Sequence, residues 1–318
     1  MNKAMSREEL LEKLDKKFAL ENQKLDDYLT GMLYNNYEPY WRYIAVDALL
    51  SLQQPKTDIP DELIFIGYHQ ITELYFKLII HELKQMSEGE LSDTAWKDKL
   101  IRIVRYFKNL IESFDIMIDG MELEQFLEFR MSLLPASGFQ SAQFRKIEMA
   151  CTDMENLVAE NKRSTVDGEI ESQYQHIYWK QGSIDNEGNK TLTLRQFETH
   201  YEKEFIQWAH DWKGNNLNQQ LRKLENEGKL TEEVIKHFKL LDVYLNINWR
   251  LSHYRSAVRY LSAKGSDVAA TGGTNWQKFL PPRFQKIISF PSLWTNEEKK
   301  NWGKTWVDEY VFGIDINN

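Results

Sequence analysis

The segment FIGYHQITELYFKLIIHEL, residues 65–83, decides the fold, because it sets one histidine, His69, within an apolar helical pattern. Apolar residues recur there at intervals of three and four, which predicts one wide buried helix face made of Ile64, Phe65, Tyr68, Ile71, Leu74, Tyr75, Leu78 and Ile79. His69 lies at the border of that face. Such a histidine is either a core residue with both ring nitrogens satisfied or a group directed at a cofactor or substrate. The spacing leaves both interpretations open.

Composition limits the class of protein. A chain of 318 residues can bury a large core, and its net charge is -8, from 40 basic and 48 acidic residues. No basic run is interleaved with aromatic residues, so nucleic acid is not an expected partner. The single cysteine, Cys151, excludes an intrachain disulfide and a cysteine-based zinc site. The N-terminus is too charged for a signal peptide, and no apolar run approaches the about 18 residues of a membrane span. We therefore expect a soluble cytoplasmic protein that does not enter a membrane.

The placement of the prolines favours long helices. The spans 61–134 and 136–280 contain none, and helical periodicity is visible over residues 6–33, 41–53, 61–87, 93–117, 122–133, 139–162, 196–226 and 231–262. We predict an all-α fold, a large bundle of long helices in one domain, 1–318. Residues 170–195 depart from the pattern, because β-prone runs flank an Asp-Asn-Glu-Gly-Asn turn. They predict a small hairpin or ordered loop insertion on the surface.

A second histidine, His253, lies in NINWRLSHYRSAVRYL, where Trp249, Ala257 and Tyr260 share its helix face. This histidine should also point inward. Neither His69 nor His253 belongs to a pair of histidines four residues apart, so the spacing of a helical zinc protease site is absent. Haem remains possible, because one axial imidazole suffices and a second can lie on the ligand side. Two ordinary core histidines are the alternative.

Two loops carry polar groups that suit a carboxylate. Arg130 ends a helix that Pro135 breaks, and Ser137 and Gly138 are expected to open the next helix with free backbone N–H groups. Thr271 precedes two glycines, so the backbone there can approach a ligand closely. A guanidinium, a hydroxyl and free amides together form a carboxylate receptor. Taken singly, each is an ordinary helix terminus.

Five motifs occur in one order along the chain: YWRYIAVDALLSLQQP at 40–55, DELIFIGYHQITELYFK at 61–77, FLEFRMSLLPASGFQSAQFR at 126–145, WRLSHYRSAVR at 249–259 and TGGT at 271–274. In these motifs the chain resembles the tryptophan 2,3-dioxygenase family. The resemblance implies a haem b enzyme that inserts both atoms of O2 into the indole ring of L-tryptophan, giving N-formyl-L-kynurenine in the kynurenine pathway of tryptophan catabolism. It also implies a homo-oligomer, a homotetramer by the habit of the family.

The resemblance implies a role for each matching residue. His253 matches the proximal ligand of the haem iron, and His69 matches the distal histidine that hydrogen-bonds the indole N–H. The pocket residues implied from the same chain are Phe65 against the indole, Arg130 on the substrate carboxylate, Thr271 on the carboxylate and ammonium, Leu133 in the wall, and Ser137 and Gly138 in the loop over the haem. A neighbouring subunit is implied to contribute Tyr40, Tyr43 and Ile44, through an N-terminal segment of about residues 1–45.

The chain departs from the family pattern in three places. Phe126 stands where the family carries a tyrosine that contacts the substrate carboxylate, so one hydrogen bond is expected to be missing. The interval from His253 to Thr271 is longer, and Tyr75 replaces a tryptophan, a change that affects packing. Two alternatives therefore stay open beside the dioxygenase: a haem-dependent monooxygenase of a substituted indole or another aromatic amino acid, and a non-catalytic haem protein.

Overall fold

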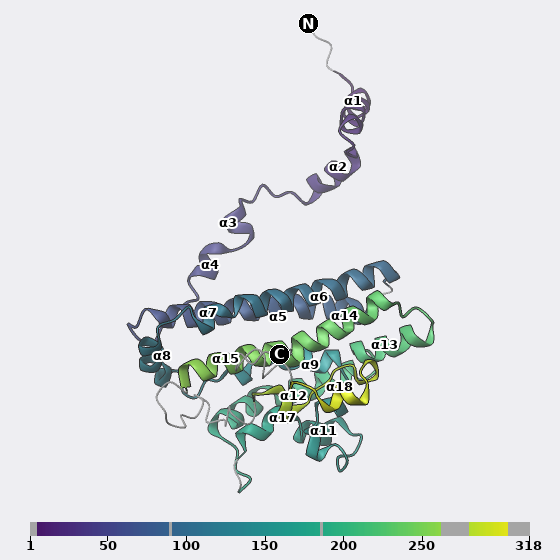
Figure 1. Ribbon diagram of the computed structural model, residues 1–318. Coiled ribbons are helices and arrows are strands. Elements are labelled where there is room, and N and C mark those ends of the chain that lie inside the picture. The colour runs from purple at the N-terminus through teal and green to yellow at the C-terminus, as the bar shows by residue number, and fades with distance from the viewer. Residues whose placement is uncertain (1–4, 89–90, 185–186, 262–279, 305–318) are drawn as a thin grey trace, which may run out of the picture. The chain divides into compact units, whose positions relative to one another are not determined.

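The computed structural model describes residues 5–88, 91–184, 187–261 and 280–304 (Figure 1). The chain divides into two compact units, Met1–Gln54 and Pro55–Asn318. Both units are built from helices, which confirms the predicted all-α class. Among the described residues no β-strand forms, and the β structure there consists of two isolated antiparallel bridges.

The N-terminal unit contains four helices: α1 (Arg7–Leu20), α2 (Leu25–Tyr34), α3 (Tyr40–Tyr43) and α4 (Val46–Leu50). Each of the two helices predicted here is divided in two, because Asn22 and Ala45 take left-handed backbone angles at the breaks. Leu25 is the one residue of these four helices that is buried. The unit therefore has almost no core of its own.

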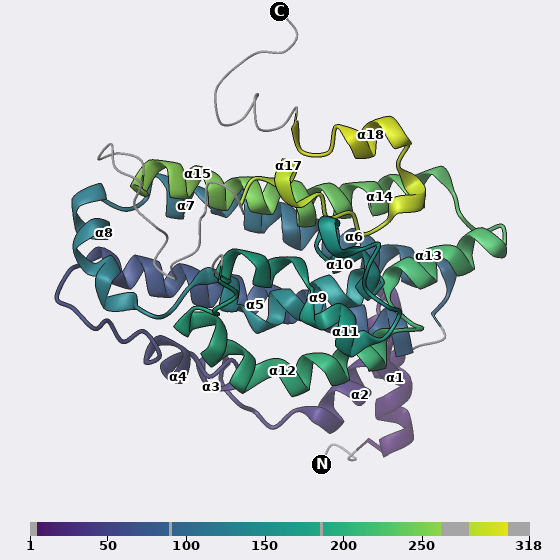
Figure 2. The same cartoon turned by 90° about the horizontal axis from the view of Figure 1, so that it is seen from below.

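The second unit holds the long helices. Its α-helices are α5 (Asp61–Glu88), α6 (Asp93–Ser113), α7 (Asp115–Ile118), α8 (Leu123–Phe129), α9 (Ala142–Cys151), α10 (Met154–Leu157), α11 (Ile170–Gln175), α12 (Leu192–Trp212), α13 (Leu217–Asn226), α14 (Glu232–Val243), α15 (Trp249–Leu261), α17 (Pro282–Gln285) and α18 (Asn296–Lys300). Figure 2 shows α5, α9 and α12 as layers of this unit, with α14 and α15 forming one long rod. Predicted and observed helices agree in place for α5, for α6 and for the rod of α14 and α15. The single helix predicted over 196–226 is instead divided into α12 and α13.

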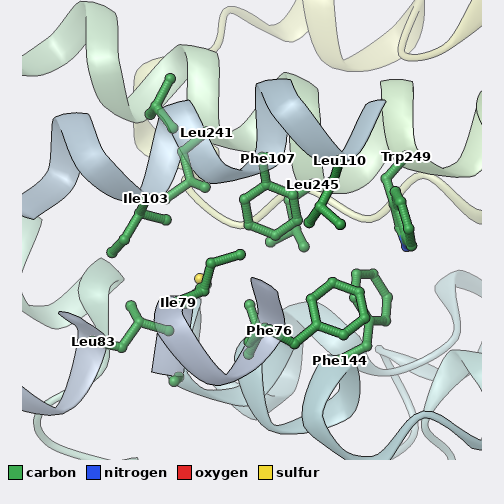
Figure 3. Packing of buried hydrophobic residues seen from close by; sticks show 14 of the residues in the cluster. Phe76, Ile79, Leu83, Ile103, Phe107, Leu110, Phe144, Leu241, Leu245 and Trp249 are labelled. Carbon is green, nitrogen blue, oxygen red and sulfur yellow. The ribbon is translucent and has the colours of Figure 1, made fainter. Parts of the chain in front are cut away.

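The main core lies between α5, α6 and the rod of α14 and α15 (Figure 3). α5 contributes Phe76, Ile79 and Leu83, and α6 contributes Phe107 and its neighbours, all of them buried. Burying one such side chain stabilises the fold by about 1.5–3 kcal/mol. The cluster therefore fixes the positions of the two helices that carry His69 and His253 relative to each other.

α5 has a second apolar stripe that faces outward. The predicted single buried face is partly wrong, because Ile71, Leu74 and Leu78 are 48%, 47% and 45% exposed. The physical reason is that α5 is apolar on two faces, and the face of Phe76 packs against α6 and α9. By length and composition alone, α5 is also apolar enough to cross a membrane, a test that a core helix of a soluble protein can pass. The expectation of no apolar run near that length is therefore wrong.

The rod that carries His253 contains one wider turn. α14 continues through a π-helical turn, η5 (Tyr244–Asn248), directly into α15. A π turn adds one residue to the turn, so all later residues are rotated compared with an uninterrupted α-helix. The rotation brings Trp249 onto the core side, and His253 follows one turn later on that side.

The predicted surface insertion, residues 170–195, is instead a partly buried loop. It consists of α11, a 3-10 turn η4 (Tyr178–Ser183) and one bridge between Ile184 and Lys190. The expected surface position is wrong, because Tyr174 and Trp179 are buried in a second core with α12. Burial of these aromatic rings outweighs the turn signal that suggested an exposed hairpin.

Candidate functional site

His69 is held in one orientation by its own helix. Its Nδ1 lies 2.7 Å from the backbone oxygen of Phe65, one turn earlier in α5. Because a carbonyl can only accept, Nδ1 carries the hydrogen and Nε2 is left with a free lone pair. Burial lowers the pKa of His69 below that of a free histidine, so the ring is neutral at neutral pH.

His253 is held in the same way on α15. Its Nδ1 donates to the backbone oxygen of Trp249, at 2.8 Å, so its Nε2 also carries a free lone pair. The pKa of His253 is lowered to about 4, mainly by burial and in part by the positive charge that His69 and Arg145 can carry nearby. A neutral imidazole with a free Nε2 is the form that binds a metal.

An aromatic chain joins the two histidines. The ring of Tyr68 lies 6.3 Å from the ring of His69 and 5.7 Å from that of Phe114. Phe114 in turn lies 4.6 Å from the imidazole of His253. Two residues 184 positions apart in sequence are therefore linked through two aromatic side chains.

The low pKa of His253 predicts how the stability of the protein depends on pH. Because the folded pKa (about 4) lies below the ordinary value, the unfolded chain takes up a proton first as the pH falls through 6.5. His253 thus removes about 2 kcal/mol of folding free energy between pH 7 and pH 4.5. We expect the free energy of unfolding of His253→Leu, measured in urea, to fall by that much less over this pH interval than the free energy of unfolding of the wild type. The exposed His200→Leu serves as control, and equal pH dependence in wild type and His253→Leu would contradict the assignment.

Among the predicted substrate residues, the structure places Phe65 directly against His69. The ring of Phe65 lies 4.2 Å from that of His69 and 5.8 Å from that of Phe129, which Arg130 follows in the chain. Arg130 is only 6% exposed, and burial lowers its pKa. The ring of Phe126 lies 4.5 Å from that of Tyr260 in a tilted arrangement, and Leu133 packs against the main core. A buried arginine therefore directly follows Phe129, whose ring packs against that of Phe65.

Hydrogen bonds fix α8 and Arg130 against the start of α5. The Asp61 carboxylate accepts from the backbone N–H of Glu122 at 2.6 Å, and the N–H of Asp61 donates to Gln125 at 3.1 Å. The ammonium of Lys56 donates to the carbonyl of Ser132 at 3.3 Å. The segment that carries Arg130 is therefore held at both of its ends.

The loop of Ser137 and Gly138 differs from the prediction. A 3-10 turn, η2 (Gly138–Gln140), stands before α9, and the N–H of Ser137 donates to the side chain of Gln140 at 3.0 Å. The amide of Gln140 also donates to the carbonyl of Thr193 on α12. The expectation that Ser137 offers a free N–H is therefore wrong, since a side chain three residues later already accepts it.

A buried ionic network, which the sequence analysis missed, lies behind this loop. Arg145 donates to Glu148 (2.7 Å), to Tyr178 (2.9 Å) and to the carbonyl of Phe139 (3.2 Å). The hydroxyl of Tyr178 donates to Glu148, which Arg250 approaches to 3.5 Å from α15. Burial, partly opposed by the two arginines, raises the pKa of Tyr178 to about 12, so the phenol keeps its proton. One signal of this network is visible in the sequence: Glu148 follows Arg145 by three residues within one predicted helix, a spacing that allows an ion pair.

Four predicted pocket residues lie outside the part of the second unit that the structure describes. Tyr40 and Tyr43 are 73% and 78% exposed and, with Ile44, belong to the N-terminal unit. Thr271 lies outside the described residues.

A surface cleft with a volume of about 560 Å³ is separate from the histidines. Met86, Trp96 and Leu224 form part of its lining, at the end of α5 far from His69. His69, His253 and Arg130 therefore do not line this cleft.

A family model described as tryptophan 2,3-dioxygenase matches residues 29–178. A tryptophan 2,3-dioxygenase of Bacillus anthracis is 30% identical over 277 residues, which cover 82% of this chain and 92% of that relative. The chain belongs to the tryptophan 2,3-dioxygenase family.

Other relatives in the tryptophan 2,3-dioxygenase family match over different lengths. One from Nocardioides sp. is 26% identical over 276 residues, covering 80% of this chain and 92% of the relative. One from Anaeromyxobacter sp. is 42% identical over 113 residues, where the chain spans only 42% of the relative's length. Membership confirms the predicted family, a family of oxidoreductases in which the ring opening of tryptophan depends on haem.

Proposed function

We propose that this chain is a haem-dependent dioxygenase that opens the indole ring of L-tryptophan with O2 and forms N-formyl-L-kynurenine. The observation that carries the proposal is the pair of neutral imidazoles, His69 and His253, linked through the rings of Tyr68 and Phe114. Family membership supports the same reaction.

His253 fits the role of the axial ligand of haem b. Its Nδ1 is engaged by the Trp249 carbonyl, an arrangement that orients a ligating histidine and makes its Nε2 a better donor to iron. The surrounding rings of Trp249 and Phe114 supply an apolar wall of the kind that keeps water from a haem. When bound, the haem would supply the chemistry with O2.

His69, Phe65 and Arg130 would position the substrate. Because Nδ1 of His69 already donates to Phe65, its Nε2 can accept the indole N–H of tryptophan. The lowered pKa keeps that acceptor unprotonated at neutral pH. The ring of Phe65 would pack on the indole, and the guanidinium of Arg130 would pair with the carboxylate. Two ends of one substrate would then be held at fixed points, which is how positioning accelerates a reaction.

Several finer assignments remain part of the proposal. Leu133 would form a pocket wall, Ser137 and Gly138 would cover the haem, and Thr271 would hold the carboxylate and ammonium. The single buried cysteine, Cys151, suits a cytoplasmic setting.

The exposed N-terminal unit supports a homo-oligomer, proposed as a homotetramer. Tyr40, Trp41 and Tyr43 are exposed aromatic residues in a unit with almost no core. Such surfaces are usually covered by a partner. The proposal assigns Tyr40, Tyr43 and Ile44 to the pocket of a neighbouring subunit, so each site would need two chains.

Restoring the hydroxyl at position 126 is expected to tighten tryptophan binding. Phe126 packs between Phe129 and Tyr260, so a tyrosine fits the same ring position. One added hydrogen bond to the carboxylate is worth about 1 kcal/mol, or roughly a fivefold lower KM in Phe126→Tyr with kcat unchanged. Steady-state kinetics checks this, with Tyr75→Phe as control. An unchanged KM would mean that residue 126 does not reach the carboxylate.

The experiment that tests the proposed function uses the full chain, loaded with haem and reduced. Incubation with L-tryptophan in air should give N-formyl-L-kynurenine, identified by mass spectrometry. A protein that binds haem and leaves tryptophan unchanged would overturn the assigned reaction. A protein that binds no haem would overturn the assignment of His253 as well.

A further inference from the structure

Phe114 occupies the junction between the helices of the two histidines. It lies where α6 ends and α7 begins, and its side chain is 4% exposed. Its ring contacts that of Tyr68 on α5 edge to face and those of Trp249 and His253 on α15. One side chain therefore touches both helices that build the site.

On the α15 side, Phe114 helps to confine the imidazole of His253. The ring of Trp249 lies 4.5 Å from that imidazole and the ring of Phe114 lies 4.6 Å from it. The carbonyl of Trp249 holds Nδ1. With two rings against the imidazole and one of its nitrogens bonded, the direction of Nε2 is set by packing.

On the α5 side, Phe114 rests on a tyrosine that is itself anchored. The hydroxyl of Tyr68 donates to the carbonyl of Leu110 on α6 at 3.2 Å, and Tyr68 is 4% exposed. His69 is the next residue along the chain. Tyr68 thus ties the position of His69 to α6, and the ring of Phe114 packs against the same tyrosine.

The chemistry of the two imidazoles does not distinguish their roles. Both rings donate from Nδ1 to a carbonyl one turn earlier, so both offer a free lone pair at Nε2. Either nitrogen is a competent iron ligand. Placement alone decides that one histidine binds the iron and the other is left to accept the indole N–H.

We propose that Phe114 is a positioning residue that sets the separation between His69 and His253, so that only His253 reaches the haem iron. The inference rests on the proposed haem function. Without this ring the two helices would have room to approach, and Nε2 of His69 would also bind the iron. The site for O2 and substrate would then be closed by the protein's own histidine.

The test is the spin state of the ferric haem in the full chain, read by electron paramagnetic resonance and the optical spectrum. The wild type is expected to be high-spin, with His253 as its one protein ligand. Phe114→Ala is expected to show the low-spin signal of two axial imidazoles as its main ferric signal. The double variant with His69→Phe should lose that signal, since the second imidazole is gone.

Phe107→Leu serves as the matched control, because Phe107 is a fully buried phenylalanine on α6 in the same core. It should weaken the fold and leave the spin state unchanged. If Phe114→Ala does not fold, Phe114→Leu, which keeps an apolar side chain, replaces it. A folded variant that stays high-spin would overturn the inference, as would a low-spin signal that survives His69→Phe. A wild type that takes up no haem would instead overturn the proposed function.

Discussion

Replacement of His253 by alanine is expected to abolish stable haem binding. The pKa of His253 is lowered to about 4, and its Nε2 is free because Nδ1 donates to Trp249. Removing a partner of a metal ligand already weakens binding by about 10–100-fold, so removing the ligand itself should exceed about 100-fold. The measurement is haem titration of the apoprotein, followed through the Soret band.

His69→Ala is the matched control for this variant, because both histidines share the same tautomer and the same bond to their own helix. It should keep the Soret band and lower the turnover of tryptophan. Oxygen attack on an electron-rich indole does not require prior loss of the N–H proton, so some activity should remain. The opposite pattern, haem lost with His69→Ala and kept with His253→Ala, would show that the two roles are exchanged.

Arg130→Ala is expected to raise the KM for tryptophan by about 30-fold or more, since truncating one partner of a buried, hydrogen-bonded charge pair costs about 2–5 kcal/mol. Arg130 is 6% exposed and stands beside the aromatic pair of Phe65 and Phe129. The haem spectrum should not change. Arg130→Lys should recover only part of the loss, because an ammonium cannot bind a carboxylate through two parallel hydrogen bonds.

Tryptamine, which lacks the carboxylate, provides a second substrate with which the role of Arg130 can be tested. The wild type should discriminate strongly between tryptophan and tryptamine in kcat/KM, and Arg130→Ala should lose most of that discrimination. Arg105→Ala, an exposed arginine on α6, is the control and should behave as the wild type. Equal discrimination in wild type and Arg130→Ala would place the carboxylate elsewhere in the protein.

The sequence predicted the long helices well, for reasons visible in particular residues. The apolar spacing around His69 and His253 is strong enough to define α5 and α15 and to point both rings inward. Motif order then connected Arg130 and Phe65 to the same site. The helix predictions succeeded because they depend on local periodicity. The common site of Arg130 and Phe65 stays a prediction.

Features that depend on contacts between distant segments were beyond the sequence. Periodicity could not tell which apolar stripe of α5 meets α6, so Ile71 and Leu74 were wrongly placed in the core. The network of Arg145, Tyr178 and Arg250 around one glutamate joins three separate segments. Phe114 carried no motif at all, since its place at the junction comes from tertiary packing.

The measurement that tests the central claim most directly is turnover of L-tryptophan under 18O2 by the haem-loaded, reduced protein. The account predicts that both oxygen atoms added to the product, one on the formyl group and one on the ring-opened ketone, carry the label. A product with a single labelled oxygen, the second coming from water, would identify a monooxygenase and contradict the account.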